Sequence, residues 1–363
     1  MINQLTRFFL IGLLLTLLTS RTQSQSRHIA SQRIFLIDKV LQNYPAASQF
    51  AVAVVQNGET RYYGAMIKDG RPMALNNQDS VFEIGSISKV FTATLLAQAV
   101  QAGQVRLLDN IQETCKCQLK DEQKITYQSL ANHTSGLPRL PSNLRLGEVD
   151  PTNPYSAYDN SKLLSYLKDE LQLSPSEKAA YAYSNLGAGL LGYCLTQVAN
   201  QNYEQLLQKQ IFQPFNMPAS TSLRAKVRDR LVAGRNAWGQ VTSNWDMSAL
   251  VGAGGIVSSV RDLVRFAEAQ FAEDNPALHL SQSTSFTVNK KLKLGLGWHI
   301  SKGESKQDIH WHNGGTGGYS SCMALDVERQ TAVIILTNVS AFHPKRDKID
   351  KLCFSLLEEL SGK

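Results

Sequence analysis

The stretch FEIGSISKVFTATLLAQAV, residues 82–100, places a glycine and a serine directly before a long apolar segment. The pattern predicts a helix that begins at Ser86 and stops at Gly103, with Lys89 one turn after the serine. Residues three apart share a helix face, so the hydroxyl and the amine would project from the same end. A lysine whose pKa is lowered by burial can accept a serine proton, and a helix N-terminus offers N–H donors to an oxyanion. The segment therefore predicts a Ser86–Lys89 nucleophile pair.

S-x-x-K alone is a weak motif, because a chain of this length contains chance matches. Ser165-Tyr-Leu-Lys168 is a second match, in a polar segment without a preceding glycine. We interpret that second pair as solvated surface. For Ser86 the competing interpretation is a helix N-cap, and the other motifs of the chain decide between the two.

Strand patterns occur at both ends of the chain. QFAVAVVQ and ETRYYGAMI enclose Asn57-Gly58, which is the strongest short hairpin signal. Four further strand-like runs follow near the C-terminus: LGLGWHI, DIHWHN, SSCMALDV and TAVIILTNV. Helical patterns cover residues 27–44, most of the stretch from about 110 to 280, and about 344–360.

This order of elements predicts an α/β (α+β) fold. Strands from both termini would form one antiparallel sheet, with the terminal helices on one face and a mostly helical insertion on the other. We place the sheet region at about 27–80 and 285–363 and the helical region at about 81–284. An active site would lie in the groove between the two regions.

Residues 1–24 have the layout of a secretory signal peptide. A basic start with Arg7 precedes an apolar run from Phe8 to Thr19, and a polar stretch follows. The run is shorter than the roughly 20 residues of a membrane span. We expect an exported protein, periplasmic or extracellular, with its domain over 27–363 and no stable membrane anchor after cleavage.

The composition is that of a globular protein, since 43% of the 363 residues are hydrophobic and 18% are charged. The chain has 37 basic and 30 acidic residues, a net charge of +7, and no run of five like charges. Nucleic acid is therefore not an expected partner, and we expect a monomer.

The odd number of cysteines, five, fits neither a disulfide framework nor two C-x-x-C knuckles. We expect buried or half-exposed free thiols, and a bridge between Cys115 and Cys117 is the strained alternative. The five are Cys115, Cys117, Cys194, Cys322 and Cys353.

The second chemical element is YAYSNLGAGLLGYC. Tyr183 and Asn185 alternate around Ser184, so in a loop both could face one cleft, where the phenol relays protons and the amide holds a carbonyl. Y-x-N is weak, and Tyr158-Asp-Asn160 also matches it, there as a helix start. The formal G-x-G-x-x-G of this stretch lacks the preceding apolar strand of a dinucleotide site.

The third element is DIHWHNGGTGGYSS. On a strand His310 and His312 would share one face, but nothing completes a zinc motif, so we expect neither a metal nor a cofactor. The glycines that follow allow a backbone edge to approach a substrate closely. Gly315 could supply the second N–H of an oxyanion hole.

Taken together, the three elements resemble the serine β-lactamase and penicillin-binding-protein superfamily. FEIGSISK is similar to the class C β-lactamase active-site motif in every position, and YSN followed by LGAGLLG is similar to its second motif. HTSGLP at 133–138 and AGGIVSS at 253–259 resemble landmarks of the same family. The resemblance extends in order from about residue 30 to 360 and implies the fold predicted above.

The resemblance also implies roles. Ser86 would be the acyl-enzyme nucleophile, Lys89 the proton shuttle and Tyr183 the partner base. Asn185 would bind the substrate amide, and the N–H groups of Ser86 and Gly315 would form the oxyanion hole. No E-x-x-L-N segment supplies a class A deacylating glutamate, so water activation falls to Tyr183 and Lys89.

One position departs from the class C pattern. His312-Asn313-Gly314 stands where those enzymes usually carry K-T-G, so a permanent cation beside the substrate is missing. With less support for a phenolate, a deprotonated Lys89 becomes the better candidate base. If His312 binds a carboxylate only when charged, KM should rise above a pH of about 6.5.

The expected function is that of an exported serine hydrolase, a class C-type β-lactamase that hydrolyses the β-lactam amide through a Ser86 acyl-enzyme. The histidine at 312 resembles that of carboxypeptidases, D-amino-acid peptidases and β-lactamase-like esterases of the superfamily, which remain alternatives. A non-catalytic penicillin-binding sensor is the alternative from another class. The expected partner is a small molecule: a β-lactam, or a D-Ala-D-Ala-type peptide or ester. The chain lacks a G-x-S-x-G elbow, which disfavours an α/β-hydrolase esterase.

Overall fold

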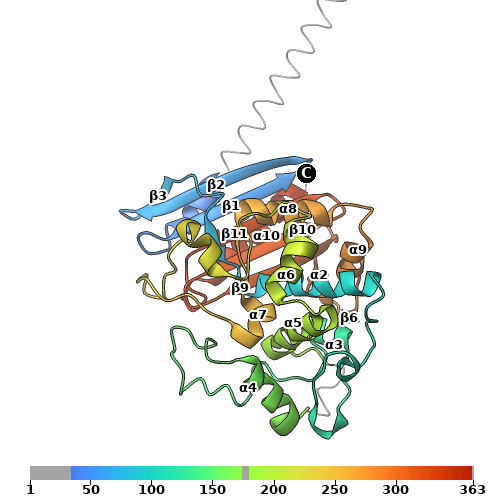
Figure 1. Ribbon diagram of the computed structural model, residues 1–363. Helices are drawn as coiled ribbons and strands as arrows, with labels where there is room; N and C mark the ends of the chain where they lie inside the picture. The colour runs from blue at the N-terminus through green and yellow to red at the C-terminus, as the bar shows by residue number, and fades with distance from the viewer. Residues whose placement is uncertain (1–33, 174–179, 362–363) are drawn as a thin grey trace, which may run out of the picture.

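A computed structural model describes residues 34–173 and 180–361 of the chain (Figure 1). The predicted signal peptide, 1–24, lies outside the described residues. No described helix is both long enough and apolar enough to cross a bilayer.

The centre of the molecule is a nine-stranded sheet in the order β3-β2-β1-β11-β10-β9-β8-β7-β6. All its neighbouring strands are antiparallel. Strand β1 from the N-terminal part pairs directly with β11 from the C-terminal part, so the two ends of the chain share one sheet, as predicted. The strands are β1 (Gln49–Gln56), β2 (Glu59–Lys68), β3 (Arg71–Ala74), β6 (Phe286–Thr287), β7 (Leu292–Leu294), β8 (His299–Lys302), β9 (Asp308–Gly315), β10 (Ser320–Asp326) and β11 (Thr331–Thr337).

The hairpin signal is confirmed, because Gln56 pairs with Glu59 across Asn57 and Gly58. Both turn residues have positive φ, 53° and 73°, as the two-residue turn of a twisted hairpin requires. The run LGLGWHI is not one strand, in contrast to the prediction. Gly297, with φ 73°, breaks it, and the Leu296 and Gly297 N–H groups donate to Ser281 and Ala131 instead.

Helices cover both faces of the sheet. The helical residues 34–41 and helix α10 (Asp347–Ser361) pack on one face, where Ile37, Leu41, Val333 and Leu356 share a buried cluster. The helical region covers the other face, as Figure 1 shows, with Ile334 and Leu336 of β11 in its larger core. Its helices are α2 (Ser88–Gln101), α3 (Tyr127–Ala131), α4 (Asn160–Ser165), α5 (Asn185–Ala199), α6 (Tyr203–Leu207), α7 (Val251–Gly254), α8 (Val260–Gln270) and α9 (Pro276–Gln282).

Helix α2 is buried on nearly all sides, which its apolar sequence requires, and contacts α5, α7 and α9. It follows directly on the short strand β4 (Val81–Glu83) and the 3-10 turn η1 (Gly85–Ile87). Strand β4 pairs with β5 (Val257–Ser259) in a separate two-stranded sheet that the sequence did not suggest. The turn η1 contacts β9 and β10, so the start of α2 lies at the junction of the helical region and the large sheet.

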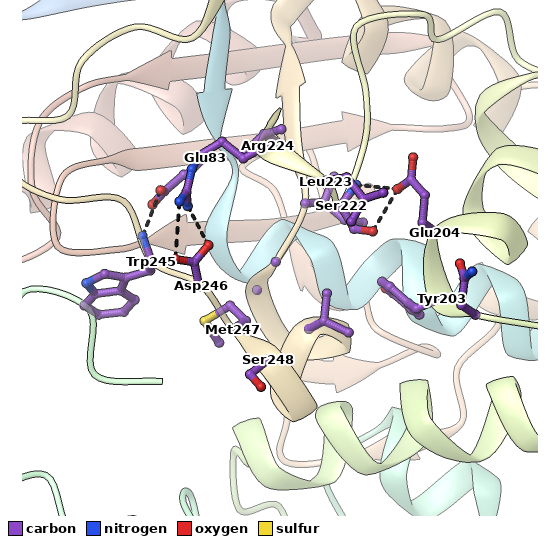
Figure 2. A pocket seen from close by; sticks show the side chains of 16 residues that line it. Glu83, Tyr203, Glu204, Ser222, Leu223, Arg224, Trp245, Asp246, Met247 and Ser248 are labelled. Carbon is purple, nitrogen blue, oxygen red and sulfur yellow. Dashed lines mark hydrogen bonds and ion pairs between the residues drawn. The ribbon is translucent and has the colours of Figure 1, made fainter. Parts of the chain in front are cut away.

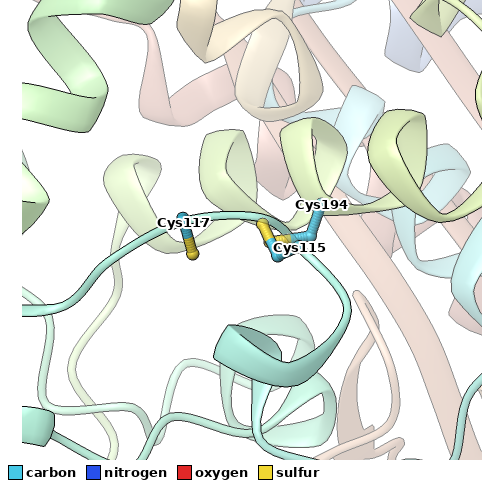
Figure 3. Close-up of side chains that lie close together, drawn as sticks. All are labelled: Cys115, Cys117 and Cys194. Carbon is cyan, nitrogen blue, oxygen red and sulfur yellow. A yellow bond between two sulfur atoms is a disulfide. The ribbon is translucent and has the colours of Figure 1, made fainter.

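The cysteine prediction is wrong for two residues. Cys115 and Cys194 form a disulfide across 79 residues of sequence, between the loop after Thr114 and the middle of α5 (Figure 3). Cys117 lies beside the bridge as a buried free thiol and does not form the strained alternative bridge with Cys115, and Cys322 and Cys353 are buried free thiols, as expected. The spacing of Cys115 and Cys194 in the sequence gave no sign of a bridge, and only the fold brings α5 against the loop.

Candidate active site

The structure brings the predicted nucleophile pair into hydrogen-bond contact. The Lys89 Nζ lies 3.0 Å from the Ser86 Oγ and donates a second hydrogen bond, 2.7 Å long, to the Ala253 carbonyl. Ser86 is on η1 and Lys89 one turn later on α2, so both leave the same end of the helix. The AGGIVSS segment therefore helps to position Lys89, because the carbonyl of its first residue, Ala253, accepts a hydrogen bond from the amine.

The lysine environment favours the neutral amine. Its side chain is 2% exposed and, among the described residues, has no carboxylate partner. Burial, with a smaller contribution from the Arg139 guanidinium, lowers the pKa of Lys89 well below its usual value. A neutral amine at 3.0 Å can take the Ser86 proton, which is the requirement for a Ser–Lys nucleophile.

Tyr183 lies against this pair. The Lys89 Nζ is 4.8 Å from the centroid of the Tyr183 ring, and Ser86 is near enough to the phenol to lower its pKa in part. Burial raises the pKa of Tyr183, and the contacts with Ser86 and Arg139 offset this only in part. The phenol is therefore protonated near neutral pH, where it can donate or relay a proton but cannot act as a phenolate base.

The loop that carries Tyr183 is fixed by the HTSGLP segment. His133 accepts a hydrogen bond from the Ser184 N–H at its Nδ1, 3.2 Å away, and the Ser184 Oγ donates to Pro138. The Asn185 N–H donates to the Arg139 carbonyl at 3.0 Å. Asn185 begins α5, and the Ser184 hydroxyl caps that helix through the Gly187 N–H. The second motif is thus a rigid helix start.

The backbones of η1 and of the end of β9 approach each other closely. Gly85 has φ 52°, and a Cβ there would lie 2.5 Å from the Gly315 nitrogen. A Cβ on Gly314 would lie 2.0 Å from the Ile84 carbonyl oxygen. Only glycine permits this approach, which brings the Gly315 backbone beside the turn that presents Ser86.

His312 faces the site from β9 as a buried neutral ring. Its Nδ1 lies 2.6 Å from the Asn313 carbonyl, and because a carbonyl only accepts, the Nδ1 carries the proton. The Nε2 is a buried acceptor without a protein partner among the described residues. Burial, and then His299 and Lys89, lower the pKa of His312 well below its usual value. The ring therefore offers the site a lone pair and no cation.

Asn313 presents its side chain elsewhere. Its Nδ2 donates to the Asp350 carboxylate of α10 at 2.8 Å, on the opposite face of the sheet from His312. Asp350 also pairs with Arg346, whose Nη1 is 2.5 Å from the carboxylate. The Asn313 amide is therefore engaged with the helix behind the sheet, and only its backbone borders the site.

Two histidines of the site were not singled out in the sequence. The rings of His133 and Tyr183 lie 4.5 Å apart, and those of His299 and His312 lie 5.0 Å apart. Burial lowers the pKa of His133 well below its usual value and that of His299 to about 4. A lone histidine in a strand or a loop gives no sequence signal, and only the fold gathers these rings.

A cavity of ≈ 360 Å³ lies beside α7 and the end of β4 (Figure 2). Glu83, three residues before Ser86, lines it and is buried. Its carboxylate accepts from the Asn244 side chain at 2.7 Å and the Trp245 N–H at 3.0 Å. Glu83 thereby ties β4 to the segment that contains Trp245. None of the predicted catalytic side chains lines this cavity.

The chain is similar to known proteins over most of its length. Residues 37–356 match the family profile described as Beta-lactamase. The chain is 29% identical over 310 residues to the D-alanyl-D-alanine-carboxypeptidase/endopeptidase AmpH of Escherichia coli, covering 78% of this chain and 77% of that protein. It is 24% identical over 349 residues to a β-lactamase of Pseudomonas fluorescens, covering 85% and 93%.

Solved structures show the same fold. The octameric penicillin-binding protein homologue from Pyrococcus abyssi superposes with a TM-score of 0.78 at 20% identity, covering 92% of this chain and 78% of that chain. A class C β-lactamase superposes with a TM-score of 0.77 at 20% identity, covering 93% and 97%. The resemblance found in the motifs is therefore confirmed over nearly the whole chain. The chain belongs to the Beta-lactamase family, within the serine hydrolases of the β-lactamase and penicillin-binding-protein superfamily.

Proposed function

We propose that the protein opens the amide bond of a β-lactam through an acyl-enzyme on Ser86. The observation that supports this most is the buried Lys89 amine, 3.0 Å from the Ser86 Oγ, with no carboxylate beside it among the described residues. Such an amine removes the hydroxyl proton as the oxygen attacks. We also propose that residues 1–24 direct export.

The proposed reaction uses the groups in turn. The Ser86 Oγ bonds to the carbonyl carbon while its proton moves to Lys89, and the N–H groups of Ser86 and Gly315 stabilise the oxyanion. The carbon–nitrogen bond then breaks, and the nitrogen receives the Lys89 proton through the Tyr183 hydroxyl. Water attacks the ester in the reverse sequence, with Lys89 as base, and releases the free Ser86 and the carboxylic acid.

A D-alanyl-D-alanine carboxypeptidase is the second candidate. The relative AmpH is named for that activity, and the histidine at 312 resembles that of carboxypeptidases of the superfamily. Both candidates share the acyl-enzyme and differ in the leaving group and in the rate of deacylation. A β-lactamase-like esterase would show the same serine dependence with neither amide substrate.

The test is steady-state hydrolysis of a chromogenic cephalosporin by the purified protein, beside Ser86→Ala and a D-alanyl-D-alanine peptide with D-alanine detection. Serine-dependent turnover over many cycles is expected for the first proposal. A stoichiometric burst that stalls, with D-alanine release, would shift the assignment to the carboxypeptidase. Acylation that persists in Ser86→Ala, seen as an adduct by intact mass spectrometry, would refute the nucleophile.

A further inference from the structure

Arg139 lies at the edge of the site with an exposed side chain and was not singled out by any motif. Its guanidinium carbon is 5.2 Å from the centroid of the Tyr183 ring, the same ring that lies 4.8 Å from the Lys89 Nζ. Its backbone is fixed, because its carbonyl accepts the N–H groups of both Asn185 and Leu186. The guanidinium is thus held beside the catalytic tyrosine.

Arg139 differs from the other basic residues around the site in its charge and in its partners. Among the described residues Arg139 has no carboxylate within ion-pair distance. Arg346, the arginine at the Gly314 end of the site, is already paired with Asp350. Since the pKa values of Lys89 and His312 are lowered by burial, neither supplies a stable positive charge at neutral pH.

The position of Arg139 indicates which part of a substrate it would meet. It is joined through its backbone to Asn185, which we assign to the substrate amide on the acyl side, whereas His312 and β9 lie across the site.

We propose that Arg139 selects substrates whose acyl group carries a carboxylate, through an ion pair between its guanidinium and that carboxylate beside the Tyr183 ring. This inference rests on the proposed acyl-enzyme function and adds the substrate class. The fork of guanidinium N–H donors matches a carboxylate, and the cation–π contact with the Tyr183 ring favours this position of the guanidinium. A preference for anionic substrates would therefore come from Arg139, on the acyl side of the site, and not from His312.

The test compares two penicillins that differ in one group on the acyl side. Benzylpenicillin and α-carboxybenzylpenicillin are allowed to acylate the full chain, and the second-order rate constant for each is measured by intact mass spectrometry. In Arg139→Gln the ratio of the anionic to the neutral rate constant should fall about tenfold or more. The ratio in the native protein should also decrease with added salt.

Two control variants make the comparison specific. Arg145→Gln removes an exposed arginine nearby in the sequence, one that pairs with Glu148 at 3.4 Å, and should leave the ratio unchanged. Arg139→Lys should keep part of the preference. If Arg139→Gln slows both penicillins equally and shifts the pH profile of acylation, the arginine acts through Lys89 or Tyr183 and the inference is overturned.

A failure of the proposed function is recognised separately. If neither penicillin acylates Ser86, β-lactam hydrolysis is refuted, and the same variants are compared on the 4-nitrophenyl monoester of adipic acid and its methyl ester. These esters need only a serine acyl-enzyme. A lower preference for the anionic ester in Arg139→Gln would sustain the inference without β-lactam chemistry. An unchanged preference, or no hydrolysis of either ester by the native protein, would overturn it.

Discussion

At the scale of single residues, the site is a buried set of bases with almost no fixed charge. Lys89, His312 and His299 are all desolvated, and each pKa is lowered because burial disfavours the cation. Tyr183 is affected in the opposite direction, since burial disfavours its anion and raises its pKa. The same physical cause therefore makes the amine a usable base and the phenol an unusable one.

Lys89→Ala should accordingly slow the acylation of Ser86 by about 10²–10⁴-fold relative to the native protein. Tyr183→Phe should slow it less. The phenol acts as a relay, whose loss water can partly replace. The rate of acylation by a chromogenic cephalosporin measures both variants. Lys168→Ala, in the second S-x-x-K match, is the control, because Lys168 and Ser165 are exposed on the surface. The reverse order of the two effects would identify Tyr183 as the base.

Binding of a substrate carboxylate should not follow the titration of His312. Its pKa is lowered, so the cation forms only at acid pH and the ring stays neutral between a pH of about 6 and 8. We therefore expect a flat KM across that range, and a flat Kd for Ser86→Ala with the same substrate. A KM that rises above a pH of about 6.5 and becomes flat in His312→Gln would show that His312 binds as a cation.

At the scale of elements, the contact between β9 and η1 builds the site. The Ser321 Oγ on β10 donates to the Ile84 carbonyl at 2.8 Å, and a Cβ on Gly314 would lie 2.4 Å from that hydroxyl oxygen. The backbone of β9 at Gly314 therefore packs directly against the Ile84 carbonyl, which lies just before the nucleophile turn. This closeness is what places the Gly315 backbone beside Gly85, the residue before Ser86.

Gly314→Ala should therefore separate the strand from the turn. The added methyl group meets the Ile84 carbonyl, so we expect a loss of about 1–3 kcal/mol in the free energy of unfolding and a strong loss of acylation. Gly147→Ala is the matched control, because a Cβ there meets nothing within 4 Å. Urea unfolding and the acylation rate are measured on both. Equal stability and equal rates in the two variants would disprove the close contact.

At the scale of the whole molecule, long-range links join the parts that form the groove. Strands β1 and β11 bring the two ends of the chain together, and the Cys115–Cys194 bridge fastens α5 to the loop beyond α2. Because α5 begins at Asn185, the bridge anchors the same helix whose first turn borders the site.

Removing that bridge should lower the free energy of unfolding more than it lowers the rate of acylation. The double variant Cys115→Ala/Cys194→Ala should lose about 2–5 kcal/mol in the free energy of unfolding, since the bridge restricts the unfolded chain. Cys117→Ala removes the neighbouring buried thiol and controls for lost packing. Urea unfolding with and without reductant measures the effect, and a reductant should lower the stability of the native protein and of Cys117→Ala, which both contain the bridge, but not that of the double variant. Equal losses in both variants would contradict the assignment.

Much of the fold and part of the site were open to prediction from local pattern. The Asn57-Gly58 hairpin, the helix after Ser86 and the strands at both termini follow from the preferences of neighbouring residues. The break at Gly297 and the Cys115–Cys194 pair did not, because their partners are distant in the chain. Local pattern predicted free thiols, whereas tertiary packing brings the sulfurs of Cys115 and Cys194 together.

The same division separates the residues of the site. That Ser86 and Lys89 share one helix end follows from their spacing in the chain, because three residues make nearly one turn. The lowered pKa of Lys89, the acceptor at His312, the hydrogen bond of the Asn313 amide to Asp350 and the place of Arg139 beside Tyr183 depend on the folded structure. Charge state and side-chain direction depend on burial and on neighbours from other elements, and these exist only after the chain has folded.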